Sequence, residues 1–137
     1  MSDLKIGDKA PEFSGKTLIL YFYPRDNTPG CTKEACSLRD DYKKLKEKGF
    51  EVVGVSPDSE ESHKKFTKKF NLPFRLIPDQ DKKLAEKYGV WVEKNMFGKK
   101  YFGIKRTTFI IEKGKIKDII KTVDTGNHAN QILKILE

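Results

Sequence analysis

The spacing of hydrophobic and polar residues predicts strands that alternate with helices. Residues 17–23 form a continuous apolar, β-prone run that ends at Pro24, and residues 50–56 form a second run of this kind. Such runs are typical of strands buried on both faces, as in parallel sheets. Between them, apolar residues recur at spacings of four and three up to Gly49, which predicts one helix with a single buried face: Cys31, Ala35, Leu38, Tyr42 and Leu45.

The rest of the chain continues this alternation and then changes. A capping-box spacing at residues 58–61 predicts a helix that runs to about Phe70. A short strand at 74–77 and a helix at 81–88 are expected next, followed by an irregular stretch at 90–105. Two β-prone runs at 107–111 and 116–120 flank a glycine-containing turn, which predicts an antiparallel hairpin, and a helix at 128–136 closes the chain.

These elements predict an α/β protein with a central mixed β-sheet and helices on both faces. Parallel strands joined by helices, followed by a hairpin and a last helix, match the thioredoxin-like arrangement. The length of 137 residues is that of one ordinary domain, so a single domain over residues 1–137 is expected.

The charge pattern favours a solvated surface over a specialised one. The chain has 28 basic and 20 acidic residues, a formal net charge of +8, and its lysines are scattered among acidic residues along the expected helices. A nucleic-acid binder would gather its positive charge with aromatic residues on one stripe, and only residues 99–106 come close to that pattern. The longest apolar run is too short to span a bilayer and residues 1–10 do not resemble a signal peptide, so we expect a cytoplasmic protein without a membrane segment.

The thiol inventory consists of Cys31 and Cys36. A secreted disulfide scaffold would carry more cysteines, and a structural zinc site needs four ligands, which the distant His63 and His128 do not supply at recognised spacings. No metal or other cofactor is therefore expected. A redox role remains.

Cys31 has a position that suits a reactive thiol. Thr28 is placed to cap the helix and Pro29 suits its first position, so Cys31 falls in the first turn. The free N–H groups and the helix dipole there favour the thiolate, which is the nucleophilic form. The alternative is a small, inert core residue, since free cysteines are commonly buried.

Cys36 lies five residues further along the same expected helix. In an ideal helix this spacing separates the two Cα atoms by roughly 8.7 Å, beyond the roughly 7 Å limit for a disulfide. If the two cysteines pair, the first turns of the helix must unwind. The alternative is that Cys36 is an incidental residue on the solvated side.

The segment from Pro24 to Cys36 resembles the peroxiredoxins. It contains the pattern Pro-x-x-x-Thr-x-x-Cys of their active site, and the second cysteine is similar to that of the bacterioferritin comigratory protein, or PrxQ, subgroup. Segments 54–59, 84–91 and 103–109 also resemble this subgroup, so the resemblance covers nearly the whole chain in order.

This resemblance implies a thiol-dependent peroxidase. It makes Cys31 the peroxidatic and Cys36 the resolving cysteine, with Thr28 in contact with the thiolate and the peroxide, Pro24 shielding the pocket, and Arg106 beside the thiolate. It also implies hydrogen peroxide and organic hydroperoxides as substrates, a Cys31–Cys36 disulfide after turnover, and thioredoxin or a similar dithiol as the reductant. From the residues alone, the favoured interpretation of Arg106 is a surface cation beside a strand.

The sequence departs from the family near its N-terminus. Only residues 14–16 separate the segment 10–13 from the first expected strand, where the family has a hairpin and a short helical stretch. We therefore expect apolar surface to be exposed near that part of the sheet, covered or not by a second copy, so that a monomer and a homodimer both remain open.

Two other functions stay open. One is a general thiol-disulfide oxidoreductase, although such enzymes use Cys-x-x-Cys whereas four residues separate the cysteines here. The other is a trimmed, inactive peroxiredoxin-like domain that binds a partner through the basic segment 99–106.

Overall fold

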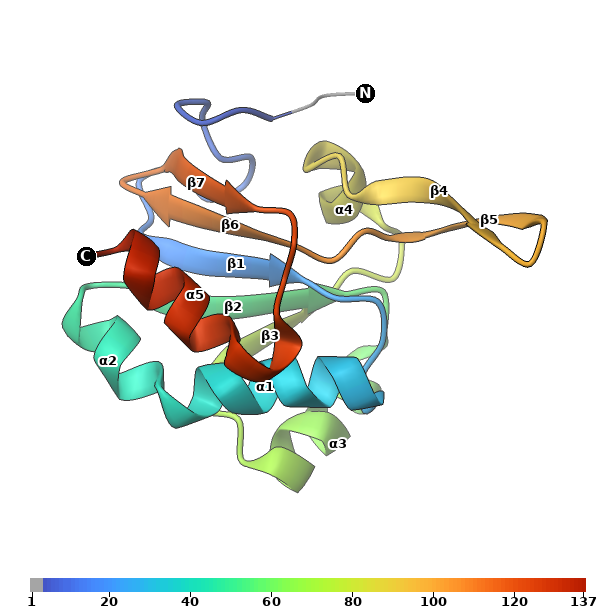
Figure 1. Cartoon of the computed structure of the whole chain (residues 1–137), viewed down its shortest axis with the longest axis horizontal. Coiled ribbons are helices and arrows are strands. Elements are labelled where there is room, and N and C mark those ends of the chain that lie inside the picture. The colour runs from blue at the N-terminus through green and yellow to red at the C-terminus, as the bar shows by residue number, and fades with distance from the viewer. Residues whose placement is uncertain (1–3) are drawn as a thin grey trace.

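The structure is a computed structural model that describes residues 4–137. A five-stranded mixed sheet forms the centre of the protein (Figure 1). The strand order is β3-β2-β1-β6-β7. The first three strands in sequence are parallel, and β6 runs antiparallel to both β1 and β7. The predicted mixed sheet is confirmed, with these strand bounds: β1 Leu18–Phe22, β2 Glu51–Ser56, β3 Arg75–Pro78, β6 Thr107–Glu112 and β7 Lys115–Ile120.

Helices cover both faces of this sheet, as predicted. One face packs against side chains of α1, α2, α3 and α5, and the other against α4. Figure 1 shows α1, α2 and α5 together in front of the sheet and α4 behind it. The bounds are α1 Pro29–Asp40, α2 Tyr42–Glu47, α3 Glu60–Phe70, α4 Lys83–Lys87 and α5 His128–Ile135, with a 3-10 turn, η1, at Thr125–Asn127.

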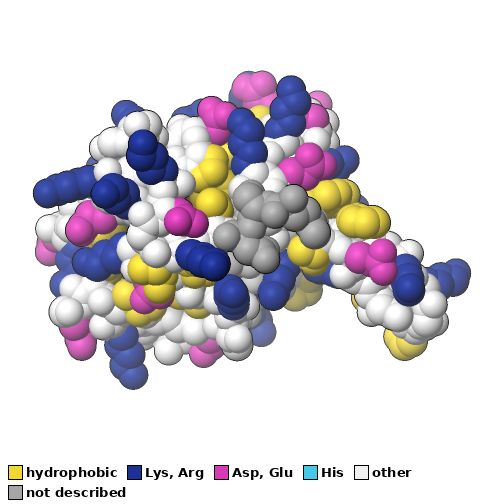
Figure 2. All heavy atoms as spheres, turned by 90° about the horizontal axis from the view of Figure 1, so that it is seen from above, with side chains coloured by type: hydrophobic (Ala, Val, Ile, Leu, Met, Phe, Trp, Pro, Cys, Tyr) yellow, Lys and Arg dark blue, Asp and Glu magenta, His cyan; other side chains and the backbone are white. Residues whose placement is uncertain are grey.

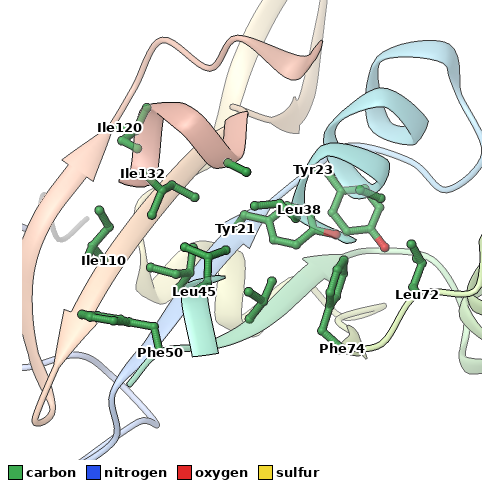
Figure 3. Packing of buried hydrophobic residues seen from close by; sticks show 14 of the residues in the cluster. Tyr21, Tyr23, Leu38, Leu45, Phe50, Leu72, Phe74, Ile110, Ile120 and Ile132 are labelled. Carbon is green, nitrogen blue, oxygen red and sulfur yellow. The ribbon is translucent and has the colours of Figure 1, made fainter. Parts of the chain in front are cut away.

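Strand β1 supplies the centre of both cores. Successive side chains of a strand point to opposite faces, so Tyr21 belongs to the cluster under the four helices while Leu20 and Phe22 belong to the cluster under α4. Figure 3 shows Tyr21 and Tyr23 beside Leu38 in the first cluster. Burial on both sides explains the unbroken apolar run that predicted this strand.

The helix predicted from Cys31 to Gly49 is divided in two. Helix α1 ends at Asp40, and Asp41 has φ −110° and ψ 14° before α2 begins. Two consecutive aspartates have low helix propensity, and their negative charges lie at the negative end of the helix dipole, which favours a break there. The buried stripe continues across the break because Leu45 of α2 is also fully buried.

Two smaller predictions also shift. Helix α3 is capped by Ser59, whose Oγ accepts a hydrogen bond from the N–H of Ser62, so the cap is one residue later than the spacing from Asp58 indicates. Asp58 instead accepts hydrogen bonds from the Ser56 hydroxyl and the Asp26 N–H. Helix α4 is shorter than the predicted 81–88.

The stretch 90–105 is regular, and the prediction of an irregular segment is wrong. Strands β4 (Trp91–Met96) and β5 (Lys99–Ile104) pair as an antiparallel hairpin. Its turn is Phe97-Gly98, with both residues at positive φ (53° and 79°). Such turns usually carry Asn-Gly or Asp-Gly, so phenylalanine at this position hides the hairpin from sequence reasoning.

The N-terminal segment runs beside β7 and the turn that precedes it. The N–H of Gly7 donates to the Ile116 carbonyl at 2.8 Å, and the N–H of Gly114 donates to the Lys16 carbonyl at 2.7 Å. Leu18 and Ile116 are buried, so the expected exposure of the sheet beside the short connection is not found. Among residues 4–137, the large hydrophobic side chains that are exposed are Ile6, Met96, Phe97, Tyr101 and Phe102.

Two further observations concern the chain as a whole. Within residues 4–137, no helix combines the length and the apolar character that a membrane span requires. The expected domain begins at residue 1, and residues 1–3 lie outside the described part of the chain.

Candidate active site

Cys31 lies in the first turn of α1, where the sequence places it. The preceding Thr28 is the N-cap residue in an extended conformation, and Pro29 occupies the start of the helix. The Cys31 residue is 1% exposed. The thiol is therefore held at the positive end of the helix dipole and away from bulk water.

Arg106 is brought against this thiol from the other half of the chain. Its Nη2 lies 3.3 Å from Cys31 Sγ, although the two residues are 75 positions apart. The pairing of Phe22 with Thr107 across β1 and β6 causes this, because it places Arg106 beside the end of β1 from which the chain leads into α1. Burial alone would lower the pKa of Arg106, but the charges of Glu34 and Cys31 outweigh it and raise that pKa. The guanidinium is thus a fixed cation beside the sulfur, and its side chain is only 23% exposed.

Glu34 holds the other side of the same guanidinium. Arg106 Nη1 donates to Glu34 Oε1 at 2.6 Å, and the Glu34 side chain is fully buried. Burial raises the pKa of Glu34 to about 7, although Arg106 acts in the opposite direction. Sequence reasoning missed this residue. The available signal was its position three residues after Cys31, which places a carboxylate on the buried face of α1.

A buried polar row continues beyond Glu34 toward α5. Glu34 Oε2 lies 3.5 Å from His128 Nε2 but has no hydrogen-bond partner among the described residues. The same His128 nitrogen is 2.7 Å from the Thr108 hydroxyl, and burial lowers the pKa of His128. A neutral His128 accepts the Thr108 proton at Nε2, which leaves nothing to donate to Glu34.

Thr28 and Pro24 lie in the loop that leads into α1, at positions that are partly buried. The Thr28 hydroxyl donates to the Arg25 carbonyl at 3.1 Å, and this is the hydrogen bond that it makes within residues 4–137. The structure therefore brings Arg106 to Cys31 but does not join the Thr28 hydroxyl to the sulfur. Of the two contacts that the resemblance implies for Thr28, with the thiolate and with the peroxide, only the contact with a peroxide oxygen stays a prediction.

The loop is anchored by Asp26, which is buried together with His63. Asp26 accepts hydrogen bonds from the Tyr23 hydroxyl at 2.6 Å and the Ser62 hydroxyl at 2.8 Å, and His63 Nδ1 lies 2.7 Å away. His63 Nε2 lies 3.1 Å from the Ile77 carbonyl, so both ring nitrogens face acceptors, an arrangement that favours the protonated imidazole. Burial opposes this charge, but Asp26 outweighs it and raises the pKa of His63.

The same cluster has the residue types of a metal site. Ligand atoms of Asp26, Asp58 and His63 lie within 4.8 Å of one another. However, the carboxylate and imidazole atoms are already engaged with each other and with the Asp26 N–H. We therefore interpret the cluster as an ion pair that fixes the loop.

Cys36 lies on the same helix as Cys31 and is partly buried. Both thiols are free, and α1 is continuous from Pro29 to Asp40. In such a helix the two Cα atoms are roughly 8.7 Å apart, which is too far for a disulfide. This conformation holds the two sulfurs apart.

The AhpC/TSA family matches residues 6–119. The chain belongs to this family. Peroxiredoxin Bcp from Bacillus subtilis is 43% identical over 98% of this chain and 96% of its own length, and peroxiredoxin Bcp from Escherichia coli K12 is 40% identical over 100% and 98%. The alignment with the Escherichia coli protein extends over 153 positions, so that relative has residues that this 137-residue peroxiredoxin lacks.

Solved structures give the same assignment. A cysteine-to-serine mutant of PrxQ from Xylella fastidiosa matches with a TM-score of 0.90 at 30% identity, covering 99% of this chain and 97% of the other. Bacterioferritin comigratory protein from Xanthomonas campestris matches with a TM-score of 0.84 at 36% identity, over 90% and 80%. The protein is therefore a peroxiredoxin of the Bcp/PrxQ type with the thioredoxin-like fold, and peroxiredoxins are thiol-dependent peroxidases.

Proposed function

We propose that Cys31 is the thiolate that reduces hydroperoxides and that Cys36 resolves the product as a Cys31–Cys36 disulfide. The contact that carries this proposal is the 3.3 Å approach of Arg106 Nη2 to Cys31 Sγ at the start of α1. A guanidinium and a helix N-terminus together stabilise an anionic sulfur that is otherwise buried. An inert core cysteine would need neither.

In the first step the Cys31 thiolate attacks one oxygen of the O–O bond. A sulfur–oxygen bond forms, the O–O bond breaks, and the sulfur is oxidised to sulfenic acid while the peroxide is reduced. The leaving hydroxide or alkoxide takes up a proton and departs as water or alcohol. Arg106 and the Thr28 hydroxyl are the donors that we assign to the oxygens as this negative charge develops, and Pro24 shields the pocket.

In the second step the Cys36 thiol attacks the sulfur of the sulfenic acid. A disulfide forms and water leaves. Because the folded helix keeps the two sulfurs apart, this step requires local unwinding of α1 between Pro29 and Asp40.

A protein dithiol, thioredoxin or one similar, then reduces the disulfide by thiol exchange and restores both thiols. For the substrate we propose hydrogen peroxide and organic hydroperoxides. The Xanthomonas campestris relative, which has alkyl peroxide reduction activity, supports the organic class. We further propose that the chain works as one domain over residues 1–137 in the cytoplasm, as a monomer or homodimer without a cofactor.

The decisive experiment combines two cysteine variants with mass analysis. Cys31→Ser is expected to abolish peroxide consumption, whereas Cys36→Ser is expected to consume about one equivalent and then stall as sulfenic acid or mixed disulfides. The wild-type protein treated with one equivalent of peroxide is expected to lose the mass of two hydrogens. Normal turnover by Cys31→Ser would refute the assignment of Cys31, and undiminished turnover by Cys36→Ser would refute that of Cys36.

A further inference from the structure

The exposed apolar side chains of the protein are concentrated on the β4–β5 hairpin. Phe97 is 98% exposed, Phe102 57%, Met96 55% and Tyr101 42%, while Ile6 is the remaining exposed large hydrophobic residue within residues 4–137. Figure 2 shows the hairpin as a protrusion with hydrophobic and basic atoms near its end. Exposed aromatic residues gathered on one projecting element mark a contact surface.

This hairpin starts directly beside the reactive thiol. Strand β5 ends at Ile104, and after Lys105 the chain reaches Arg106, whose guanidinium contacts Cys31. On the hairpin, Lys94 pairs with Tyr101 across the strands, so both side chains lie on one face. Lys94 is close enough to the site that Arg106 lowers its pKa and Cys31 raises it, in addition to the larger lowering by burial. The end of the hairpin that leads into Arg106 therefore lies beside the site.

Gly103 lies on the same face of the hairpin as Lys94 and Tyr101. A Cβ there would lie 3.4 Å from Lys94 Cδ, so the glycine leaves room for the lysine stem to lie across the hairpin. Lys99 and Lys100 lie exposed near the turn, and the acidic residue of the hairpin, Glu93, is only 3.9 Å from Lys100. The hairpin therefore presents an apolar surface with excess positive charge, which complements an acidic partner.

The size of the surface fits a transient partner. Met96 and Tyr101 lie on one face of the hairpin, Phe102 lies on the other face, and Phe97 is in the turn. With about 200 Å² for one fully exposed aromatic side chain, the turn and the face of Met96 and Tyr101 together offer roughly 400 Å² of apolar surface. A stable interface needs about 800 Å² from each partner, whereas weak redox complexes bury less. A permanent second copy of the chain is therefore a poorer match than an electron-donating protein that binds and leaves.

We infer that the β4–β5 hairpin is the docking surface for an acidic dithiol protein that reduces the Cys31–Cys36 disulfide. This inference rests on the proposed function, because only a resolved disulfide needs such a donor. Phe97 and Met96 lie roughly 20 Å from Arg106 along β5, so they pack against an apolar patch of the partner away from its thiols, while Lys99 and Lys100 meet its carboxylates. The partner is then held beside the start of α1, where the disulfide forms.

The test compares a protein reductant with a small one. Phe97→Ser is chosen because Phe97 is almost fully exposed, and Ile6→Ser is the matched control, with an exposed apolar residue on the N-terminal segment. With Escherichia coli thioredoxin as the probe, Phe97→Ser is expected to raise the KM for thioredoxin by roughly fivefold or more. Turnover with dithiothreitol and the rate of Cys31 oxidation are expected to stay unchanged in both variants.

Charge reversal gives an independent readout. The double variant Lys99→Glu, Lys100→Glu is expected to raise the same KM, with the largest effect at low ionic strength. An unchanged KM in both hairpin variants would overturn the inference. It would also be overturned if dithiothreitol supports turnover of the wild-type protein but neither thioredoxin nor glutaredoxin does. If dithiothreitol also fails to support turnover, the proposed function fails first, so the two failures are distinguishable.

Other occupants of the hairpin would give different results. A dimer that Phe97→Ser dissociates in sedimentation, with the KM for thioredoxin unchanged, would assign the surface to a second copy and overturn the inference. Salt-dependent binding of a duplex DNA probe that is lost in Lys99→Glu, Lys100→Glu, again with unchanged KM, would assign it to nucleic acid and overturn it equally.

Discussion

Two side chains of opposite charge, Arg106 and Glu34, lie in a row beside the Cys31 sulfur. Arg106 lies between Cys31 Sγ and Glu34 Oε1, with one guanidinium nitrogen on each. The planar fork of arginine donates to both partners at once, which a lysine ammonium on a flexible stem does not reproduce. Glu34 thus acts on the thiol indirectly, by fixing the direction of the guanidinium.

Replacing Arg106 by lysine is expected to slow the oxidation of Cys31 by about 10-fold to 100-fold. The reason is the loss of a charge-assisted hydrogen bond, which contributes roughly 1.5–3 kcal/mol. Stopped-flow measurement of Cys31 oxidation by hydrogen peroxide gives this rate, and Arg75→Lys on exposed β3 is the control. A wild-type rate in both Arg106→Lys and Arg106→Gln would show that the guanidinium has no part in the reaction.

Glu34 makes the stability of the protein depend on pH. Its pKa rises from the ordinary 4.5 to about 7 on folding, so the folded state binds more protons than the unfolded state between these values. The free energy of unfolding therefore falls as the pH rises from 4.5 to 7, by about 3 kcal/mol. Glutamine does not titrate, so Glu34→Gln removes this fall in the free energy of unfolding.

The variant Glu34→Gln is consequently expected to gain stability relative to the wild type as the pH rises from 5 to 8. Urea unfolding at several pH values measures the difference, and Glu47→Gln on exposed α2 is expected to show no such trend. Parallel stability curves for the wild type and Glu34→Gln would contradict the elevated pKa of the carboxyl group.

At the scale of elements, helix α1 links the chemistry to the packing of the fold. It carries both cysteines and Glu34, and the hydroxyl of its Ser37 accepts a hydrogen bond from the N–H of Ala129 in α5 at 3.1 Å. An unwound α1 therefore gives up contacts with α5 as well as its own backbone hydrogen bonds. The disulfide must compensate for this loss.

Oxidation by one equivalent of peroxide is expected to speed amide hydrogen exchange across residues 31–40 and at Ala129. The reason is that a Cys31–Cys36 disulfide cannot form within the helical spacing and holds these N–H groups open. Mass-resolved exchange of the oxidised and reduced protein provides the comparison. Amides of α3 and the Cys36→Ser variant serve as controls, and unchanged protection of α1 would remove the unwinding step from the mechanism.

For the whole molecule, the short N-terminal connection is closed by a close backbone contact. Gly114, in the turn between β6 and β7, has φ +80°, and a Cβ there would lie 2.4 Å from the Gly15 backbone nitrogen. No side chain fits between these two segments. The same region carries the hydrogen bonds that hold residues 7–16 beside β7 and its turn.

Gly114→Ala is therefore expected to destabilise the protein by about 3 kcal/mol or more. The matched control is Gly98→Ala, because Gly98 has a similar φ of +79° but nothing within 4 Å, so only the backbone strain of about 1 kcal/mol applies. Urea unfolding of both variants measures the difference. Equal losses would mean that the two segments separate without cost.

The amino-acid sequence determined the features that depend on neighbours along the chain. The buried runs of β1 and β2, the start of α1 at Pro29 and the β6–β7 hairpin follow from local periodicity and turn residues, and all were predicted correctly. The position of Cys31 at a helix N-terminus belongs to the same group. Local signals failed where a residue type is unusual for the conformation that it adopts, as for Phe97 at positive φ in the β4–β5 turn.

Only the tertiary structure decided which distant residues meet. The resemblance suggested Arg106, but its contact with Cys31 depends on the register between β1 and β6, which no local pattern specifies. The burial of Glu34 and the Asp26–His63 ion pair arise in the same way, because their partners lie 72 and 37 residues away. The sequence indicates Cys31 as the sulfur that we propose to react, and the folded sheet places the charged side chains of Arg106 and Glu34 beside it.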